Sequence, residues 1–229
     1  MIHNAVDRAM QRASSYDQSE AYASKTTVHT IYIDNSRISN IETKVDTGMM
    51  FRMSKDGKLG KASVSLNGEG SVDNCLRMAD TVLGFSPVDD EFKGYAQPGQ
   101  ARIGMPDVWD DRVDSITPDD LREIAKTLIG ECRVNIPRAQ IRLSSTESHV
   151  MNGNGVDAVH RSTLVYGHFT SMTVIDHPGE GMETYHGTHL NLDPVEIAHA
   201  LSDKAEAAAV CREFKGTEGM TMILPPSEL

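Results

Sequence analysis

The side chains best suited to bind a metal ion gather in the segment 177–189. This segment holds His177, Glu183, His186 and His189. Imidazole and carboxylate groups are the usual ligands of hydrolytic zinc, so one hypothesis is a metal-dependent hydrolase that uses His177, Glu183 and His186. On a strand, however, the three-residue separation of His186 and His189 places them on opposite faces. We therefore expect surface and edge-strand histidines here. The same expectation holds for two further histidines, His160 and His168.

Motifs for nucleophilic catalysis and phosphate binding are missing from the sequence. It contains no nucleophile elbow, P-loop, dinucleotide glycine fingerprint or HExxH helix. Gly68-Glu69-Gly70 precedes a predicted helix, but no Lys-Ser or Lys-Thr pair follows, so a phosphate loop is not indicated. These patterns therefore identify no catalytic, cofactor-binding or metal-ligating residue.

The three cysteines, Cys75, Cys132 and Cys211, are far apart and form no CxxC pair. They indicate neither a disulfide framework nor a zinc knuckle, and they fit a reducing, cytoplasmic compartment. Each lies beside apolar positions of a predicted helix, so we expect buried, unreactive thiols.

The composition is that of an acidic chain with enough apolar residues for a packed core. Hydrophobic residues make up 39% of the 229 residues, aromatic residues only 5%, and the formal charge is -11. Lysine and arginine are scattered singly, so direct nucleic-acid binding is disfavoured. No apolar run approaches the roughly 18 residues of a membrane-spanning helix, and we expect no membrane insertion. The acidic positions of one segment predict a solvated loop, with a weak cation site as the alternative: Asp107, Asp110, Asp111 and Asp114.

Hydrophobic periodicity predicts a helix, four antiparallel strands and a second helix in the first part of the chain. A period of three to four residues up to Ala13 changes to a period of two from Ser19. Asp56-Gly57 predicts a hairpin turn, because such a turn needs positive φ angles. The expected strands are 19–33, 38–42, 48–53 and 61–66, and the expected helices are 2–13 and 71–83.

The same order recurs after an irregular, Pro-rich stretch. Thr117-Pro118-Asp119-Asp120 predicts a helix start, with a hydroxyl cap, proline in the first turn and acids at the positive end of the dipole. The strands expected to follow are 139–151, 156–159, 164–175 and 182–190, and a helix is expected from Asp193 to Cys211.

These patterns predict an α+β protein of two tandem related units, each a helix, four antiparallel strands and a helix. The alternative is that two ordinary α+β domains look alike by chance. The expected divisions are an N-terminal unit at 1–84, a surface linker at 85–116, a second unit at 117–215 and the start of a missing C-terminal domain at 216–229.

Four segments in this order resemble the TldD/PmbA family, also called modulators of DNA gyrase. The first two are Ser19-Glu20-Ala21-Tyr22 with the hairpin 33–42, and Asp46–Arg52 with Gly57–Ser63. The others are Val108-Trp109-Asp110 ahead of the Thr117 helix, and Ser148–Arg161 with its Asn152-Gly153-Asn154-Gly155 turn, continuing to Gly216–Pro226. The likeness covers nearly the whole chain.

The resemblance implies a cytoplasmic protein in which a TldD-type subunit pairs with a PmbA/TldE-type subunit to form a peptidase for unfolded peptides. It also implies zinc, held by an HExxxH helix and a later cysteine in a C-terminal domain that begins about where this chain ends. No histidine or cysteine here matches those ligands, so zinc is expected only in the absent C-terminal domain of a TldD-type subunit. The ending 223–228 is closer to the PmbA type, which lacks the zinc motif.

The function expected from these observations is non-catalytic: the N-terminal portion of a TldD/PmbA-like metallopeptidase assembly, forming the wall of a peptide chamber and a dimer surface. Its expected partners are a second copy or a TldD/PmbA-type subunit, together with unfolded peptide. The alternative is a stand-alone module that binds extended peptides by strand addition at an exposed sheet edge.

Overall fold

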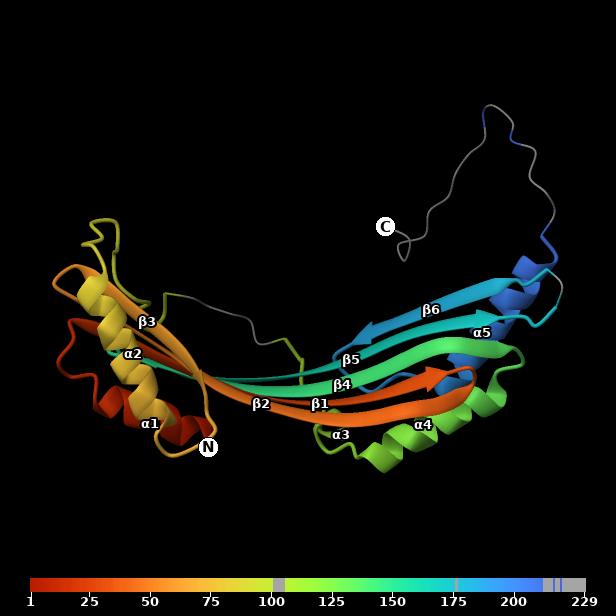
Figure 1. Ribbon diagram of the computed structural model, residues 1–229, viewed down its shortest axis with the longest axis horizontal. Helices are drawn as coiled ribbons and strands as arrows, with labels where there is room; N and C mark the ends of the chain where they lie inside the picture. Colours follow the sequence, from red (N-terminus) through yellow and green to blue (C-terminus); the bar gives the residue numbers. More distant parts are fainter. Residues whose placement is uncertain (101–105, 176, 212–215, 217–218, 220–229) are drawn as a thin grey trace.

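The computed structural model describes residues 1–100, 106–175, 177–211, 216 and 219, which form one antiparallel sheet with helices on one side (Figure 1). The strands lie in the order β3-β2-β1-β4-β5-β6. Helices α1 and α2 lie at one end of this long sheet, and α4 and α5 lie at the other. The elements are α1 (Ile2–Gln11), β1 (Gln18–Asp34), β2 (Arg37–Lys55), β3 (Lys58–Ser65), α2 (Ser71–Phe85), α3 (Asp111–Asp114), α4 (Pro118–Glu131), β4 (Asn135–Asn152), β5 (Asp157–Met172), β6 (Glu180–Gly187) and α5 (Pro194–Ala209).

The α+β class is confirmed, but each unit contributes three strands rather than four to the described part of the chain. The expected strands 38–42 and 48–53 are one strand, β2, and 156–159 and 164–175 belong to one strand, β5. Backbone pairing continues through both breaks, where Lys44 lies opposite Val28 and Arg161 opposite Glu147. The alternation of apolar and polar residues stops there because both faces of the strands are exposed. Such alternation indicates that one face of a strand is buried, and it does not indicate whether the backbone is paired with a neighbouring strand.

The helix starts follow their capping residues. The Thr117 hydroxyl accepts a hydrogen bond from the Asp120 backbone N–H, and the Asp120 carboxylate accepts one from the Thr117 N–H, as a capping box requires. The Asp193 carboxylate caps α5 in a similar way. Helix α2 differs from expectation, because its cap residue is Gly70 and the Ser71 hydroxyl instead accepts a hydrogen bond from the Asn67 N–H.

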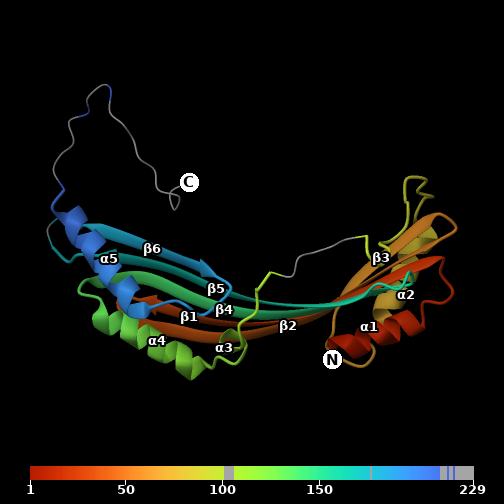
Figure 2. The ribbon, with the colours of Figure 1, turned by 180° about the vertical axis from the view of Figure 1, so that it is seen from behind.

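Both helix pairs pack on the same face of the sheet, which we call the convex face (Figure 2). On β1, Ala21 and Ala23 belong to a core cluster with α1 and α2, whereas Ile31 and Ile33 belong to a second cluster with α4 and α5. All four residues have odd numbers, and successive side chains of a strand point to opposite faces. One face therefore carries two separate cores at its two ends.

The two units show the same pairing of small and aromatic residues. Ala21 on β1 lies opposite Phe51 on β2, and Ala139 on β4 lies opposite Phe169 on β5. Each residue of the second pair lies 118 positions after its counterpart in the first. Both phenylalanines are fully buried in their respective cores. This correspondence supports the predicted duplication.

Glycine allows the closest contact between sheet and helix in both units. A Cβ atom on Gly60 of β3 would lie 2.4 Å from the Ala79 carbonyl oxygen of α2, and one on Gly181 of β6 would lie 2.8 Å from the Leu201 carbonyl oxygen of α5. Any larger residue would force these backbones apart, so the last helix of each unit rests directly on its third strand.

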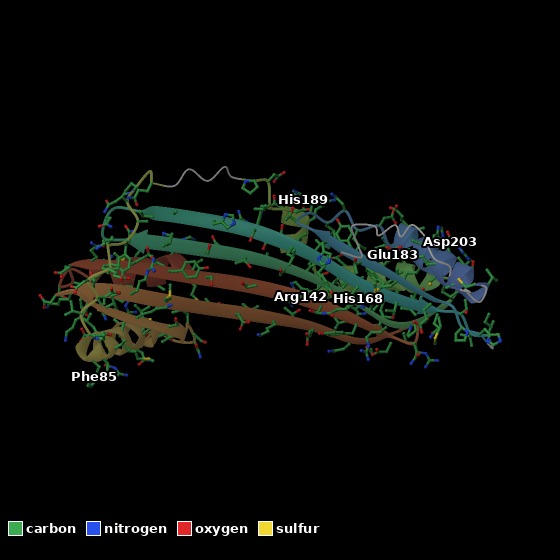
Figure 3. All side chains as sticks on the ribbon, turned by 90° about the horizontal axis from the view of Figure 1, so that it is seen from above. Phe85, Arg142, His168, Glu183, His189 and Asp203 are labelled. Atoms are coloured by element: carbon green, nitrogen blue, oxygen red, sulfur yellow. The ribbon has the colours of Figure 1, made fainter. Side chains whose placement is uncertain are left out.

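The described parts of the predicted linker, 85–100 and 106–116, are attached to the sheet at Tyr95 and at Asp110. Tyr95 is buried, its N–H donates to the Gln18 side chain, and its ring lies 4.6 Å from the Arg52 guanidinium carbon. Phe85, where α2 ends and the predicted linker begins, is 89% exposed and lies at the far end of the molecule in Figure 3. The predicted segment 216–229 lies outside the described residues apart from 216 and 219.

Asp110 is the main attachment of the linker to the second unit. Its buried carboxylate accepts hydrogen bonds from Arg112 and from the Leu190 backbone N–H, at 2.8 Å. Its own N–H donates to the Thr163 hydroxyl on β5. The expectation of a solvated loop is therefore wrong at Asp110, because this carboxylate is buried and binds the distant Leu190 N–H as well as the neighbouring Arg112 side chain. The remaining acids of the predicted loop are exposed as expected: Asp107, Asp111 and Asp114.

We predict that Asp110→Asn lowers the free energy of unfolding by about 2 kcal/mol, because it weakens charge-assisted hydrogen bonds at a buried site. Urea denaturation at pH 7 measures this change. The exposed Asp114→Asn variant is the matched control and should stay within about 0.5 kcal/mol of the wild type. Equal stability of the two variants would contradict the assigned role of Asp110.

The contribution of the Asp110 carboxylate to the free energy of unfolding should depend on pH. Hydrogen bonds from Arg112 hold the pKa of the Asp110 carboxyl well below its usual range, outweighing its burial. A lowered folded-state pKa stabilises the protein above the unfolded value of about 4, and this stabilisation is lost as the pH falls further. The stability difference between wild type and Asp110→Asn should therefore be full at pH 7 and shrink below about pH 4.

Candidate functional site

The face of the sheet opposite the helices is open, and we call it the concave face (Figures 1 and 3). It is formed mainly by the even-numbered residues of β1, β2, β4 and β5, whose odd-numbered neighbours contribute to the two cores. Among the described residues, no helix packs on it, and the linker around Tyr95 rests on one end. Four long strands run across this face, so it offers an extended surface rather than a cleft.

Aromatic and apolar side chains lie along the concave face. Tyr22 on β1 and Leu164 on β5 are 36% and 46% exposed, and Met182 on β6 is also 46% exposed. The rings of Tyr166 and His186 meet edge to face with centroids 5.0 Å apart. Exposed apolar groups interrupted by polar ones are suited to a partner with mixed side chains.

A shallow hollow of about 530 Å³ lies at the end of the concave face near β3. Tyr22 and Met50 give it apolar walls, and serine hydroxyls supply polar groups. It is large enough to receive side chains of a bound peptide. Its lining residues are Tyr22, Ser24, Gly48, Met49, Met50, Ser63, Val64 and Ser65.

Charged groups on the concave face are balanced between the two signs. Arg52 forms an ion pair of 2.6 Å with Glu20, whose side chain is only 9% exposed. Arg142 on β4 lies opposite Tyr166, and Figure 3 shows it close to His168 on the neighbouring strand. The face therefore lacks the strong negative charge of the chain as a whole, and it can donate as well as accept hydrogen bonds.

On the convex face, a polar cluster joins α1 to the middle of the sheet. His149 Nε2 lies 2.8 Å from Asp157 Oδ1, and His149 Nδ1 lies 3.1 Å from His3 Nδ1. His3 Nε2 in turn lies 3.1 Å from Glu147 Oε1. Sequence reasoning missed this cluster because His3 and His149 are 146 residues apart in the sequence. The one local signal for this cluster is that Glu147 and His149 are two residues apart on a strand, which places both side chains on the same face.

A small polar hollow of about 170 Å³ adjoins this cluster between the two helix pairs. The Arg161 guanidinium carbon lies 3.7 Å from the centroid of the Trp109 ring. Glu147 belongs both to this hollow and to the histidine cluster. The uncovered middle of the convex face is thus filled by hydrogen bonds and stacking instead of an apolar core.

The structure separates the residues of the hypothetical metal site. Glu183 forms an ion pair of 2.8 Å with Lys204, whereas His186 contacts Tyr166 on the concave face. His189 lies 3.4 Å from the Asp107 carboxylate, and His177 is exposed in a turn. Across the ranges that the structure describes, no three His, Cys, Asp or Glu side chains are grouped so that they could hold a metal ion.

The other predicted positions are placed as follows. His160 and His168 lie on β5 at even positions, as expected for strand-face residues. Cys75 is buried as expected, and burial raises the pKa of its thiol. Cys132 is half-buried and Cys211 is exposed, so the expectation of a buried thiol is wrong for Cys211, which follows the end of α5.

Comparison with known proteins relates this chain to the family named above. Residues 19–81 match the family model for PmbA/TldA metallopeptidase domain 1. Comparison with curated protein sequences finds no significant match.

The fold is shared with several solved structures. TldE from Thermococcus kodakarensis is similar with a TM-score of 0.79 and 18% identity, over 88% of this chain and 47% of that protein. A protein from Thermotoga maritima described as a modulator of DNA gyrase gives a TM-score of 0.76 and 15% identity, over 90% of this chain and 48% of its own. A similarly described protein from Bacteroides thetaiotaomicron gives a TM-score of 0.72 and 14% identity, over 89% of this chain and 49% of that protein. This chain therefore spans about half the length of these proteins.

The resemblance predicted from sequence is thus confirmed by the domain 1 match and by the shared fold. A separate observation is that no helix among the described residues combines the length and apolar character needed to cross a bilayer.

We predict that His149→Gln lowers the free energy of unfolding by about 1–3 kcal/mol, because one glutamine amide cannot bridge Asp157 and His3 as the two ring nitrogens do at this part-buried site. Amide hydrogen exchange should show faster opening of α1 than of α4, since only α1 is attached through this cluster. His160→Gln, on the exposed part of β5, is the control and should leave both quantities unchanged. Uniform loss of protection in both helices would contradict this local role.

Proposed function

We propose that this chain forms the peptide-facing, non-catalytic part of a TldD/PmbA-like metallopeptidase assembly. In this proposal the concave face is the wall of a chamber that receives unfolded polypeptide. The observation that carries the proposal is the placement of all long helices on the convex face, which leaves four long strands open on the other side.

The chemistry of the concave face supports binding of polypeptide over binding of nucleic acid. Exposed groups such as Tyr22 and Leu164 can contact apolar side chains of an unfolded peptide. Arg52 is already paired with Glu20, so it does not contribute to a basic stripe. Mixed, shallow contacts of this kind favour little sequence specificity, as expected for a surface that receives many different peptides.

Zinc is not assigned to this chain in the proposal. The described residues offer no group of three converging ligands, so the donor set does not fit a hydrolytic zinc ion. Hydrolysis would belong to a subunit that carries the HExxxH motif. The proposed partners are a second copy of this chain or a TldD/PmbA-type subunit, and the proposed location is the cytoplasm. Sizing the chain with and without a full-length relative tests the partnership.

We predict that the double variant Tyr22→Ala/Tyr166→Ala weakens binding of fluorescein-labelled unfolded casein about tenfold, because two aromatic contacts are lost from the concave face. Fluorescence anisotropy with the full chain measures the affinity. Val82→Ala removes a comparable exposed apolar group from α2 on the convex side, and it should bind as the wild type does.

Two results would overturn the proposal. One is unchanged casein binding by the double variant when its thermal unfolding matches that of the wild type. The other is robust cleavage of casein by the pure chain with added zinc, since the proposal places hydrolysis in another subunit.

A further inference from the structure

Among the described residues, strand β2 has a backbone edge that stays unpaired beyond the end of β3, over about half of its length. Strand β3 pairs with β2 from Lys55 to Gly48, and the Leu66 N–H then donates to the Thr47 carbonyl oxygen. Backbone groups alternate between the two edges of a strand, so the next residue that faces this edge is Val45. Val45 is 55% exposed, and among the described residues no segment pairs with it on the side away from β1.

The second unit shows what the equivalent edge of β5 does. Strand β6 pairs with β5 up to Val165, opposite Gly187. Two residues further on, the Thr163 N–H donates to the Val108 carbonyl oxygen at 2.8 Å. The Thr163 hydroxyl also accepts a hydrogen bond of 3.0 Å from the Asp110 N–H. An extended segment of the chain's own linker therefore binds beside β5 where β6 ends.

The displacement of 118 residues that relates Phe51 to Phe169 also relates Val45 to Thr163 and Thr47 to Val165. In both units the third strand therefore stops pairing at equivalent residues, Thr47 and Val165. Two residues earlier in the sequence, the N–H groups of Val45 and Thr163 point to the edge that the third strand has left. In the second unit the linker occupies this position. In the first unit, the described residues place no segment there.

We propose that the β2 edge from Ile41 to Val45 binds an extended peptide as an added strand in line with β3. The unpaired backbone groups require a partner with backbone donors and acceptors, which an extended peptide supplies. Val45 and Ile41 favour an apolar side chain on the convex side. The formal charge of -11 favours a basic peptide, and Glu42 supplies a nearby carboxylate, whereas Asp46 is already paired with Lys44 at 2.7 Å. This inference goes beyond the chamber wall proposed above, because it assigns peptide binding to a different surface.

The test uses a fluorescein-labelled peptide of seven residues that alternates lysine and valine. Val45→Pro removes the outward N–H without removing a hydrogen bond to β1, and proline is tolerated in edge strands. We expect at least about tenfold weaker binding by fluorescence anisotropy. Val45→Thr is the matched control: it keeps the N–H, reproduces the residue found at Thr163, and should bind within about twofold of the wild type.

A second probe keeps the test independent of the variant's folding. In the proposed register the valines lie on the convex side and their N–H groups face β2, so the same peptide with N-methylated valines loses the donors to this edge and should bind the wild-type chain at least about tenfold more weakly. Unchanged affinity for this probe, or for Val45→Pro, would overturn the proposal. Loss of binding in Tyr22→Ala/Tyr166→Ala with retention in Val45→Pro would locate the peptide on the concave face, overturning the edge site while leaving the chamber wall intact.

Discussion

The pairing of β1 with β4 is the constraint on which the rest of the structure depends. These strands run antiparallel without interruption from Glu20 opposite Asn152 to Asp34 opposite Arg138. Near the middle, the hydroxyls of Thr26 and Thr146 lie 3.0 Å apart. Because β1 and β4 are each the edge strand of a three-stranded unit, this one seam joins the two units into one six-stranded sheet. A slip of one residue would move every core side chain of a unit to the opposite face.

The register of this seam also determines which surfaces are free. Odd-numbered residues of both strands face the helices, so both cores lie on the convex face and the concave face stays open. The helix pairs lie far apart along the sheet, and the convex middle is left to polar contacts such as those of His149 and Arg161. The surface proposed to receive peptide and the polar cluster that attaches α1 therefore follow from one geometric cause.

Local patterns in the sequence predict the helices, the turns and the duplicated order, because capping residues and apolar periodicity act over short distances. Thr117 and Asp193 cap helices where their types suggest. The same patterns do not predict a strand where its side chains are exposed, as between Ile41 and Gly48. The strand continues there because its backbone pairs with β1, and no buried face marks it in the sequence. They also fail for Asp110 and His3, whose partners lie far away in sequence. The opposite faces predicted for His186 and His189 require one strand over 182–190, but β6 ends at Gly187 and His189 lies beyond it. Histidine spacing also cannot identify the concave face, which exists only once the seam has formed.

Site-specific photocrosslinking tests the central claim most directly. A photoreactive amino acid at Leu164 would lie on the concave face, and one at Val82 would lie on α2 on the convex side, with both positions about equally exposed. With labelled unfolded casein and the full chain, the open concave face predicts crosslinks from position 164 and none above background from position 82. Crosslinks from position 82 alone would contradict the assignment of the concave face as the peptide-receiving surface.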